Sequence, residues 1–551
     1  MATQAAVHVG VSEVRPATRL RALLQRERGT LWTAVIYSIA IALLSLALPV
    51  ATQAVVNTIA FGNLMQPLLV LTLVVAAVLV VSGILQMIRF HVVELIQRRV
   101  FVQIASDSVS RLLRARIDTL QSLNGPELVN RFLEVVGLQK AAATLLVDGL
   151  SIGMQTLAGM VLLGLYHPWL LAFDALLLFT LLIVIFPLSM GAVDTAVKES
   201  KAKYALVAWL EEVARHARVF RGRSEAEWAF ARTNELVEHY LEYRAVHFRI
   251  LMRQYGGTLA IQALASAALL GVGGLLVIDR QLTLGQLVAA ELVVAAVVAG
   301  ISKIAKHLES YYDLLASVDK LAMLTELPVE SDGSELPLAQ STPARVEIRT
   351  PKFEVEFLPG DRVGIDGISG SGKTLLVDAM CGFRQMGGWT VEMDGLDLRH
   401  LRLAEVRSRT QLVRGVDIFQ GTILENVRVG REDISLQEIQ IALETLGVWD
   451  AVQSLPEGLE TILATGGTPL SEGQAQILMI ARAIVGKPRL LILDETLDYV
   501  MDARERERIM DVVFGAEQPW TLVVVTSRPD LLKRCNKIVH MPEGTVREVR
   551  A

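Results

Sequence analysis

The sequence predicts a membrane protein: an all-α six-helix transmembrane domain with cytoplasmic helical extensions, followed by an α/β domain of the P-loop class. The N-terminal part carries apolar runs long enough to cross a bilayer, and long polar stretches of helical pattern separate them into pairs. A glycine-rich loop lies between a strand and a helix in the C-terminal part. Of the 551 residues, 52% are hydrophobic, too many for an ordinary soluble enzyme, and the net charge of −5 argues against a nucleic-acid binder.

Composition divides the chain into four segments. Residues 328–344 are polar and rich in proline and serine, which is typical of a linker. We therefore expect a cytoplasmic N-terminal segment over 1–29, the transmembrane domain over 30–327, the linker over 328–344 and the α/β domain over 345–551.

The apolar stretches predict the individual spans. About 20 apolar residues cross a bilayer as a helix. Six stretches qualify, and they form three hairpins joined internally by short turns: 33–56, 66–88, 141–165, 169–190, 257–278 and 284–302.

The long polar stretches between the hairpins predict the orientation. Within the transmembrane domain, residues 89–140 and 191–256 hold most of the positive charge, whereas the short turns hold almost none. By the positive-inside rule, both stretches and both termini are cytoplasmic. Their helical pattern predicts stalks that reach toward the C-terminal domain, with tips near 123–132 and 208–222. Ordinary cytoplasmic loops are the alternative.

Acidic residues within the apolar stretches are candidates for a substrate path. Asp148, Asp174 and Glu291 lie in such stretches, and ionisable groups in a bilayer tend to face the bundle interior or water. Asp174 and Glu291 lie well inside their spans, so we expect them to line a substrate path. The alternative is an interfacial position or a structural hydrogen bond.

The loop "GISGSGKT" at 367–374 predicts a phosphate-binding site. It follows the strand "DRVGID" and opens a helix, which is the setting of a P-loop. Backbone N–H groups of such a loop surround phosphate oxygens, and Lys373 would reach the β and γ phosphates while Thr374 would bind Mg²⁺. The candidate phosphate-binding residues are Gly367, Ser369, Gly370, Ser371, Gly372, Lys373, Thr374 and Leu375.

Two further motifs complete the candidate site. The strand "RLLILDE" at 489–495 ends in two acids: Asp494 is placed to hold Mg²⁺, and Glu495 to orient or deprotonate the attacking water. "LSEGQ" at 470–474 opens a helix, where Ser471, Gly473 and Gln474 form a second anion-binding segment. The catalytic candidates are therefore Glu495, Asp494 and Lys373.

The ordered set of P-loop, "LSEGQ" and "LLILDE" resembles the nucleotide-binding domain of ABC transporters. With its six spans, the whole chain resembles an ABC exporter half-transporter of the type I secretion and multidrug/lipid exporter branch. The resemblance implies a bacterial inner-membrane protein whose two nucleotide domains close head to tail on ATP and Mg²⁺. Ser471 and Gly473 of one chain would face Lys373, Thr374 and Glu495 of the other. A homodimer is expected, and a heterodimer stays open.

The chain departs from that family around the γ-phosphate. Arg414 stands where a glutamine normally helps hold Mg²⁺ and water, and Gln411, three residues earlier, is the alternative. Ser527 stands where a histidine normally contacts the γ-phosphate; a serine donates a hydrogen bond but carries no positive charge. Arg414 can supply positive charge in its place. Because the histidine contact and the glutamine ligand are both missing, slow hydrolysis is expected.

Two other family features are in doubt. The stretch before the P-loop offers only Phe353 and Phe357 to stack on adenine, and both alternate with polar residues as strand positions do. Asp498 and Asp502 compete for the aspartate that normally follows the catalytic glutamate.

The function expected from these features is ATP-driven export with attenuated hydrolysis. Two alternatives stay open: the catalytically weak half of a heterodimeric transporter, and an ATP-binding membrane gate with little turnover. The lipid bilayer is the expected surrounding, no nucleic acid is expected, and the secretion resemblance adds a periplasmic adaptor and an outer-membrane channel as candidate partners. The transported substrate is not indicated.

Overall fold

The computed structural model describes residues 15–61, 65–123, 125–331, 333, 343–500, 502–541 and 547–550. These residues form two compact units, the first comprising Met1–Ala115 with Thr119–Val329 and the second Arg116–Asp118 with Glu330–Ala551. The central part of the expected linker, 334–342, lies outside the described residues, as do residues 1–14 of the N-terminal segment.

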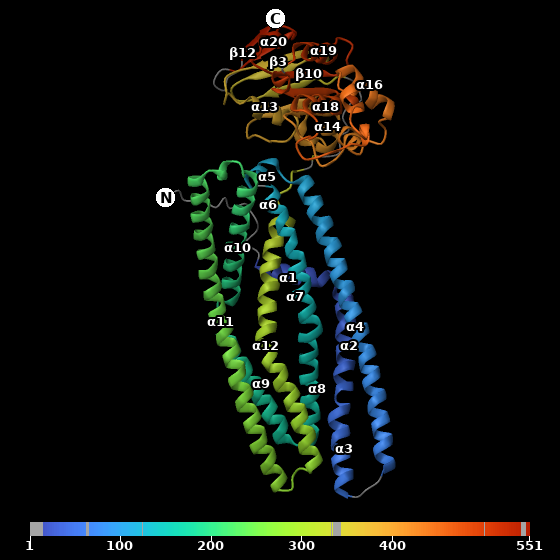
Figure 1. The fold of residues 1–551 in the computed structure, drawn as a ribbon, viewed down its shortest axis with the longest axis vertical. Coiled ribbons are helices and arrows are strands. Elements are labelled where there is room, and N and C mark those ends of the chain that lie inside the picture. Colours follow the sequence, from blue (N-terminus) through green and yellow to red (C-terminus); the bar gives the residue numbers. More distant parts are fainter. Residues whose placement is uncertain are drawn as a thin grey trace. The chain divides into compact units, whose positions relative to one another are not determined.

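The first unit is helical (Figure 1). Its α-helices are α1 (Pro16–Arg26), α2 (Arg28–Ser45), α3 (Ala47–Phe61), α4 (Met65–Arg114), α5 (Ile117–Leu123), α6 (Gly125–Asn130), α7 (Glu134–Thr144), α8 (Leu150–Tyr166), α9 (Pro168–Leu188), α10 (Ala192–Arg215), α11 (Arg223–Ile278) and α12 (Leu284–Thr325). The first two residues of α5, Ile117 and Asp118, belong to the short segment that groups with the second unit.

The predicted apolar stretches are found in these helices. Within the described residues, four helical segments are long and apolar enough to cross a membrane: Arg28–Thr58, Leu68–Arg114, Leu128–Tyr166 and Arg223–Ile278. The helices α9 and α12 hold shorter apolar segments, Pro168–Thr180 and Leu284–Val297. The helical extensions are confirmed, because α4 and α11 each continue unbroken from an apolar stretch into a polar one.

Polar contacts fix the ends and neighbours of α12. Thr283 caps its first turn, accepting a hydrogen bond from the backbone N–H of Gln286, whose side chain accepts the N–H of Thr283 in return. The short helix α1 lies across the long helices (Figure 1), and Arg19 ties it to α12 through Asp319 at 3.0 Å and Glu326 at 2.8 Å.

The second unit is an α/β domain with a six-stranded sheet in the order β12-β11-β3-β10-β9-β6. Its strands are β3 (Arg362–Asp366), β6 (Thr410–Arg414), β9 (Leu490–Asp494), β10 (Thr521–Val525), β11 (Lys537–His540) and β12 (Arg547–Arg550). A four-stranded antiparallel sheet holds β1 (Val346–Arg349), β2 (Glu354–Phe357), β4 (Thr390–Met393) and β5 (Leu396–Asp397), and a short ladder joins β7 (Gly421–Thr422) and β8 (Ile462–Leu463).

Helices flank this sheet on both sides (Figure 1). They are α13 (Lys373–Met380), α14 (Leu403–Arg409), α15 (Ile423–Arg428), α16 (Leu436–Leu446), α17 (Trp449–Gln453), α18 (Glu472–Val485), α19 (Ala503–Val513) and α20 (Pro529–Leu532). Every residue of β9 and β10 is buried, as expected for strands covered on both faces.

The parallel pairing decides where the functional side chains meet. The strand β9 pairs in parallel with both β10 and β6, and β10 pairs in parallel with β3. The carboxyl ends of all four strands therefore lie at one edge of the sheet, where ligands of open α/β sheets bind. The P-loop, Glu495, Arg414 and Ser527 each lie at or just after such a strand end.

Candidate nucleotide site and a cavity between helices

The loop after β3 has the backbone of a phosphate-binding loop. Gly370 and Gly372 adopt φ angles of 83° and 98°, in the left-handed region that favours glycine. A Cβ on Gly367 would lie 2.5 Å from the carbonyl oxygen of Met541, so this position needs glycine for a close approach. The helix α13 begins at Lys373, so the N–H groups of its first turn point toward the loop.

The side chains of the loop leave donors for an anion. Lys373 folds back, and its Nζ donates to the carbonyl oxygens of Gly367 at 2.7 Å and Ile368 at 3.1 Å. The Ser371 hydroxyl is buried, and among the described residues it has no hydrogen-bond partner. Because buried hydroxyls are nearly always paired, Ser371 fits a site completed by a ligand oxygen. Ser369 and Thr374 are exposed beside it, and Leu375 is half-buried.

The acidic pair at the end of β9 is split between burial and exposure. Asp494 is buried at the strand end, whereas the side chain of Glu495 is exposed. The φ angle of Glu495 is 55°, uncommon outside glycine, and its N–H donates to the carbonyl of Val525 at 2.9 Å. This anchor holds a backbone conformation that costs energy.

Arg414 forms the central ion-pair network of this edge. Its Nε donates to Oδ2 of Asp494 at 2.6 Å, and its Nη1 donates to Oδ1 of Asp378 at 2.9 Å. Asp378 lies on α13 and is buried, and its other oxygen is 3.1 Å from Nε of Arg384. Sequence reasoning missed Asp378 and Arg384. The available signal was an acid in an otherwise apolar helix, one turn beyond Thr374.

This network bears directly on Mg²⁺. Thr374 and Asp494 offer a hydroxyl and a carboxylate, the oxygen donors that Mg²⁺ prefers. One oxygen of Asp494, however, is engaged by Arg414, a fixed cation that repels a divalent ion. The residues at this edge therefore do not fit a Mg²⁺ site well. The alternative Gln411 does not replace Arg414, because its Nε2 lies 3.4 Å from the carbonyl of Arg407, away from the strand end.

The end of β10 carries Ser527 next to a buried threonine. Ser527 is exposed, and the preceding Thr526 donates from its hydroxyl to Oδ1 of Asp498 at 2.5 Å. Burial raises the pKa of Asp498, and the hydrogen bond from Thr526 opposes that shift. Asp502 has a different task, because it accepts the N–H groups of Arg504 and Glu505 as the cap of α19. Of the two competing aspartates, Asp498 is the one bonded to the strand end beside Ser527.

The "LSEGQ" segment forms an exposed helix start. Ser471 caps α18 by accepting the N–H of Gln474, and the Gln474 side chain accepts the N–H of Ser471. A Cβ on Gly473 would meet no atom within 4 Å, so the first turn is open on that side. Such a helix start suits an anion presented from outside this chain.

The two phenylalanines before the P-loop pack within the domain. Phe357 is fully buried in the sheet core. Phe353 packs edge-to-face on Trp389, with ring centroids 5.9 Å apart. Both rings serve packing within the domain.

The two acids expected on a substrate path lie in different surroundings. Asp174 on α9 is 1% exposed, and neither carboxylate oxygen has a hydrogen-bond partner among the described residues. Glu291 on α12 is exposed on the surface of the single chain, and so is Asp148. The structure therefore brings Asp174 alone into the packed interior.

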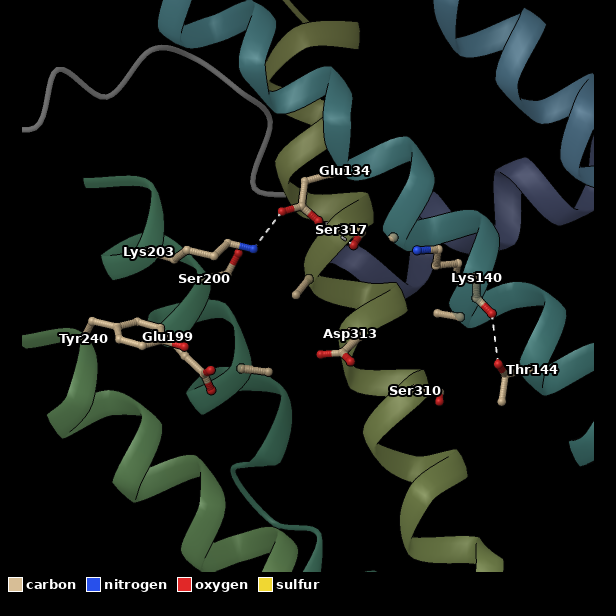
Figure 2. A pocket seen from close by; sticks show the side chains of 14 residues that line it. Glu134, Lys140, Thr144, Glu199, Ser200, Lys203, Tyr240, Ser310, Asp313 and Ser317 are labelled. Carbon is tan, nitrogen blue, oxygen red and sulfur yellow. Dashed lines mark hydrogen bonds and ion pairs between the residues drawn. The ribbon is translucent and has the colours of Figure 1, made fainter. Parts of the chain in front are cut away.

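A polar cavity lies between helices of the first unit, at a place that sequence reasoning did not single out (Figure 2). It measures about 400 Å³ and is lined by α7, α10, α11 and α12. Its charged and hydroxyl-bearing residues are Glu134, Lys140, Thr144, Glu199, Ser200, Lys203, Tyr240, Ser310, Asp313 and Ser317.

Glu134 organises one wall of this cavity. It accepts hydrogen bonds from Lys203 at 3.0 Å, Tyr204 at 2.7 Å and Ser317 at 2.9 Å, joining α7, α10 and α12. Glu199 is paired with Arg244 at 3.2 Å. Asp313 has no ion-pair or hydrogen-bond partner among the described residues, so its charge is open to the cavity.

Comparisons with known proteins agree with this architecture. Residues 351–498 match the family model described as ABC transporter. An ATP-dependent lipid A-core flippase of Thiobacillus denitrificans is 32% identical over 202 residues, which cover 36% of this chain and 35% of that protein. The cyclolysin secretion/processing ATP-binding protein CyaB of Bordetella pertussis is 24% identical over 550 residues, 95% of this chain and 75% of that protein. This chain thus spans about a third of the flippase's length.

The fold is similar to the solved structure of a bacterial Atm1-family ABC exporter with ATP bound. The TM-score is 0.82 at 19% identity, and the match covers 96% of each chain. This likeness confirms the predicted fold class, a helical apolar part followed by an α/β domain with a parallel sheet.

Proposed function

We propose that this chain, which is an ABC exporter half-transporter by its fold and its nucleotide-binding domain, works as an ATP-driven exporter with attenuated hydrolysis. ATP lies between two nucleotide-binding domains, and their closure moves a substrate from the cytoplasm or inner leaflet outward. The parts assigned to ATP are the P-loop with Lys373, the acid Glu495 and, from the second chain, Ser471 and Gly473.

ATP binding is supported by the loop backbone and its donors. The left-handed glycines, the start of α13 and the Ser371 hydroxyl, which has no partner among the described residues, all suit phosphate oxygens. Lys373 neutralises the β and γ phosphates once it leaves the loop carbonyls that it now contacts. Glu495 is exposed at the same sheet edge and orients or deprotonates the attacking water.

Attenuated hydrolysis rests on one observation, the bridge from Arg414 to Asp494 and Asp378. Asp494, the carboxylate expected to hold Mg²⁺ for the reaction, is already bound to Arg414. Ser527 adds to this, because it offers no positive charge to the γ-phosphate. Losing one charge-assisted contact in such a site lowers a rate by on the order of a hundredfold.

The assembly proposed is a homodimer in a bacterial inner membrane, with both termini cytoplasmic. Arginine and lysine are concentrated in the long extensions rather than in the short turns, which favours this orientation. The likeness to CyaB, named for cyclolysin secretion, extends over most of this chain and supports a role in secretion. A periplasmic adaptor and an outer-membrane channel are the partners proposed for that role. Recovery of those proteins with the tagged chain from membranes would support the secretion assembly.

The proposed ATPase activity is tested by measuring ATP hydrolysis by the full chain in lipid nanodiscs. We expect the wild type to hydrolyse ATP slowly but measurably faster than Glu495→Gln, because only the glutamate can act as base. Ser527→His should raise the rate, since it adds a charge beside the γ-phosphate. A wild-type rate equal to that of Glu495→Gln would contradict the proposal that this chain hydrolyses ATP by itself.

A second candidate is the weak half of a heterodimer. It is favoured by the two departures, Arg414 and Ser527, which both affect the site built by this chain's own P-loop, whereas the Ser471 segment that serves a partner keeps its motif. Mass measurement of the purified assembly separates the two. Two copies of this chain indicate the homodimer, and one copy with a different ABC chain indicates the heterodimer.

A further inference from the structure

We propose that Arg414 is a built-in cation that takes the place of the divalent metal at Asp494, so that this chain binds ATP without Mg²⁺. The inference rests on the proposed function, because it concerns the same nucleotide site. It extends that function by naming the form of the ligand, a metal-free nucleoside triphosphate.

The position of Arg414 follows from the sheet. It is the last residue of β6, and the parallel ladder pairs it with Asp494, the last residue of β9. The two side chains meet at the carboxyl edge, with Nε 2.6 Å from Oδ2. A hydrogen bond between two charged groups at this distance is among the stronger polar contacts in proteins.

A second carboxylate fixes the orientation of the guanidinium. Asp378 lies on α13, one helical turn after Thr374, and its side chain is only 4% exposed. It accepts from Nη1 of Arg414 at 2.9 Å. Arg414 is therefore held by two buried acids from two elements that border the phosphate loop. An arginine fixed in this way loses little additional side-chain entropy when it meets a ligand.

The guanidinium keeps a free donor for the phosphates. The Arg414 side chain is 36% exposed, and its Nη2 makes no hydrogen bond to any residue that the structure describes. An arginine has five N–H donors, so two are used by the acids and others remain for phosphate oxygens. Together with Lys373, Arg414 supplies the positive charge that an ATP–metal complex would otherwise bring.

The same geometry disfavours a bound metal. Two positive charges that lie a few ångströms apart near a protein surface repel each other, and a divalent ion doubles this repulsion. Mg²⁺ approaching Asp494 would meet that repulsion from Arg414, while one carboxylate oxygen is already occupied. Asp378 also pairs with Arg384 at 3.1 Å, so it keeps a cationic partner when Arg414 is replaced.

The experiment measures the dissociation constant of ATP by isothermal titration calorimetry on the full chain in nanodiscs, once with Mg²⁺ and once with EDTA. We expect the wild-type constant to change by less than about threefold between the two conditions. Arg414→Gln should bind ATP at least about tenfold more weakly in EDTA than in Mg²⁺, because it loses the internal cation and frees Asp494 for the metal.

Two further variants control for disturbed structure. Arg384→Gln removes a cation from Asp378 without touching Asp494, and it should stay independent of Mg²⁺. Asp378→Asn keeps the arginine but weakens its anchor, and it should fall between the wild type and Arg414→Gln. The inference is wrong if the wild type loses ATP binding in EDTA, or if Arg414→Gln binds ATP as the wild type does in both conditions. Either result would leave the proposed function standing. Absence of ATP binding in both conditions would overturn the proposed function and this inference with it.

Discussion

Each unit contains a network of ion pairs and hydrogen bonds around a charged side chain, and the two networks differ in the role that we expect for them. In the second unit, Arg414 bridges Asp494 and Asp378 beside the phosphate loop. In the first unit, Glu134 collects Lys203, Tyr204 and Ser317 beside the cavity. In the Arg414 network a cation is held by two acids, whereas in the Glu134 network an acid is held by a cation and two hydroxyl groups. The comparison shows that burial and hydrogen bonding alone do not mark a ligand site.

What separates the networks is the backbone around them. The Arg414 network borders left-handed glycines and a helix start, which provide N–H groups for an anion. The Glu134 network has no left-handed glycines: Glu134 begins α7 directly after the 3-10 helix Arg131–Leu133, whose carbonyls already accept its N–H, and Lys203 and Ser317 lie within α10 and α12. Ligand binding is therefore expected to depend on the first network, and helix packing on the second.

The largest expected effect is the loss of ATP binding in Lys373→Ala. The ammonium is the mobile cation of the phosphate loop, and its removal should weaken ATP binding by at least about a hundredfold, or about 2.7 kcal/mol. Lys203→Ala is the matched control, since it removes a lysine from the Glu134 network. Titration calorimetry with ATP should give an unchanged constant for Lys203→Ala. Equal losses in both variants would contradict the division between the networks.

A smaller effect is expected in Glu134→Ala. The change leaves the buried Tyr204 hydroxyl and Ser317 without their acceptor, which should lower the unfolding free energy by about 1–3 kcal/mol. Thermal unfolding in nanodiscs measures the shift, and ATP affinity should stay unchanged. Asp313→Asn lines the same cavity but breaks no contact of the described residues, so its unfolding temperature should stay near that of the wild type. A shift in Asp313→Asn as large as that in Glu134→Ala would refute the packing role.

Much of the fold and the phosphate loop could be predicted from sequence because they depend on local pattern. Apolar runs, the glycine spacing and the acids at the end of β9 are visible within a few neighbouring positions. Asp378 escaped prediction because its contact with Arg414 joins positions 36 residues apart. The Glu134 network spans more, with Ser317 lying 183 residues away. Such contacts depend on helix and strand packing that no single segment encodes.

The position of the substrate acids shows the same limit. Hydropathy places both Asp174 and Glu291 in spans, but it does not tell which face of a helix packs inward. In the structure Asp174 is buried and Glu291 is exposed. A cavity at the polar ends of the helices escaped prediction for the same reason, because four separate helices contribute to it.

The smallest expected effect is a pH dependence carried by Lys320, which lies beside the Glu134 network. The side chain is 3% exposed, its Nζ is 4.7 Å from the Tyr204 ring centroid, and burial lowers the pKa of Lys320 to about 7. Between about pH 7 and the ordinary lysine value near 10.4, the unfolded chain therefore binds more protons than the folded one. Stability should rise with pH across this window, by at most about 1.4 kcal/mol per pH unit. Thermal unfolding from pH 7 to 9 should show a shallower pH slope for Lys320→Met than for the wild type. Parallel slopes would show that this lysine is charged in the fold, and that the Glu134 network tolerates a buried cation as the Arg414 network does.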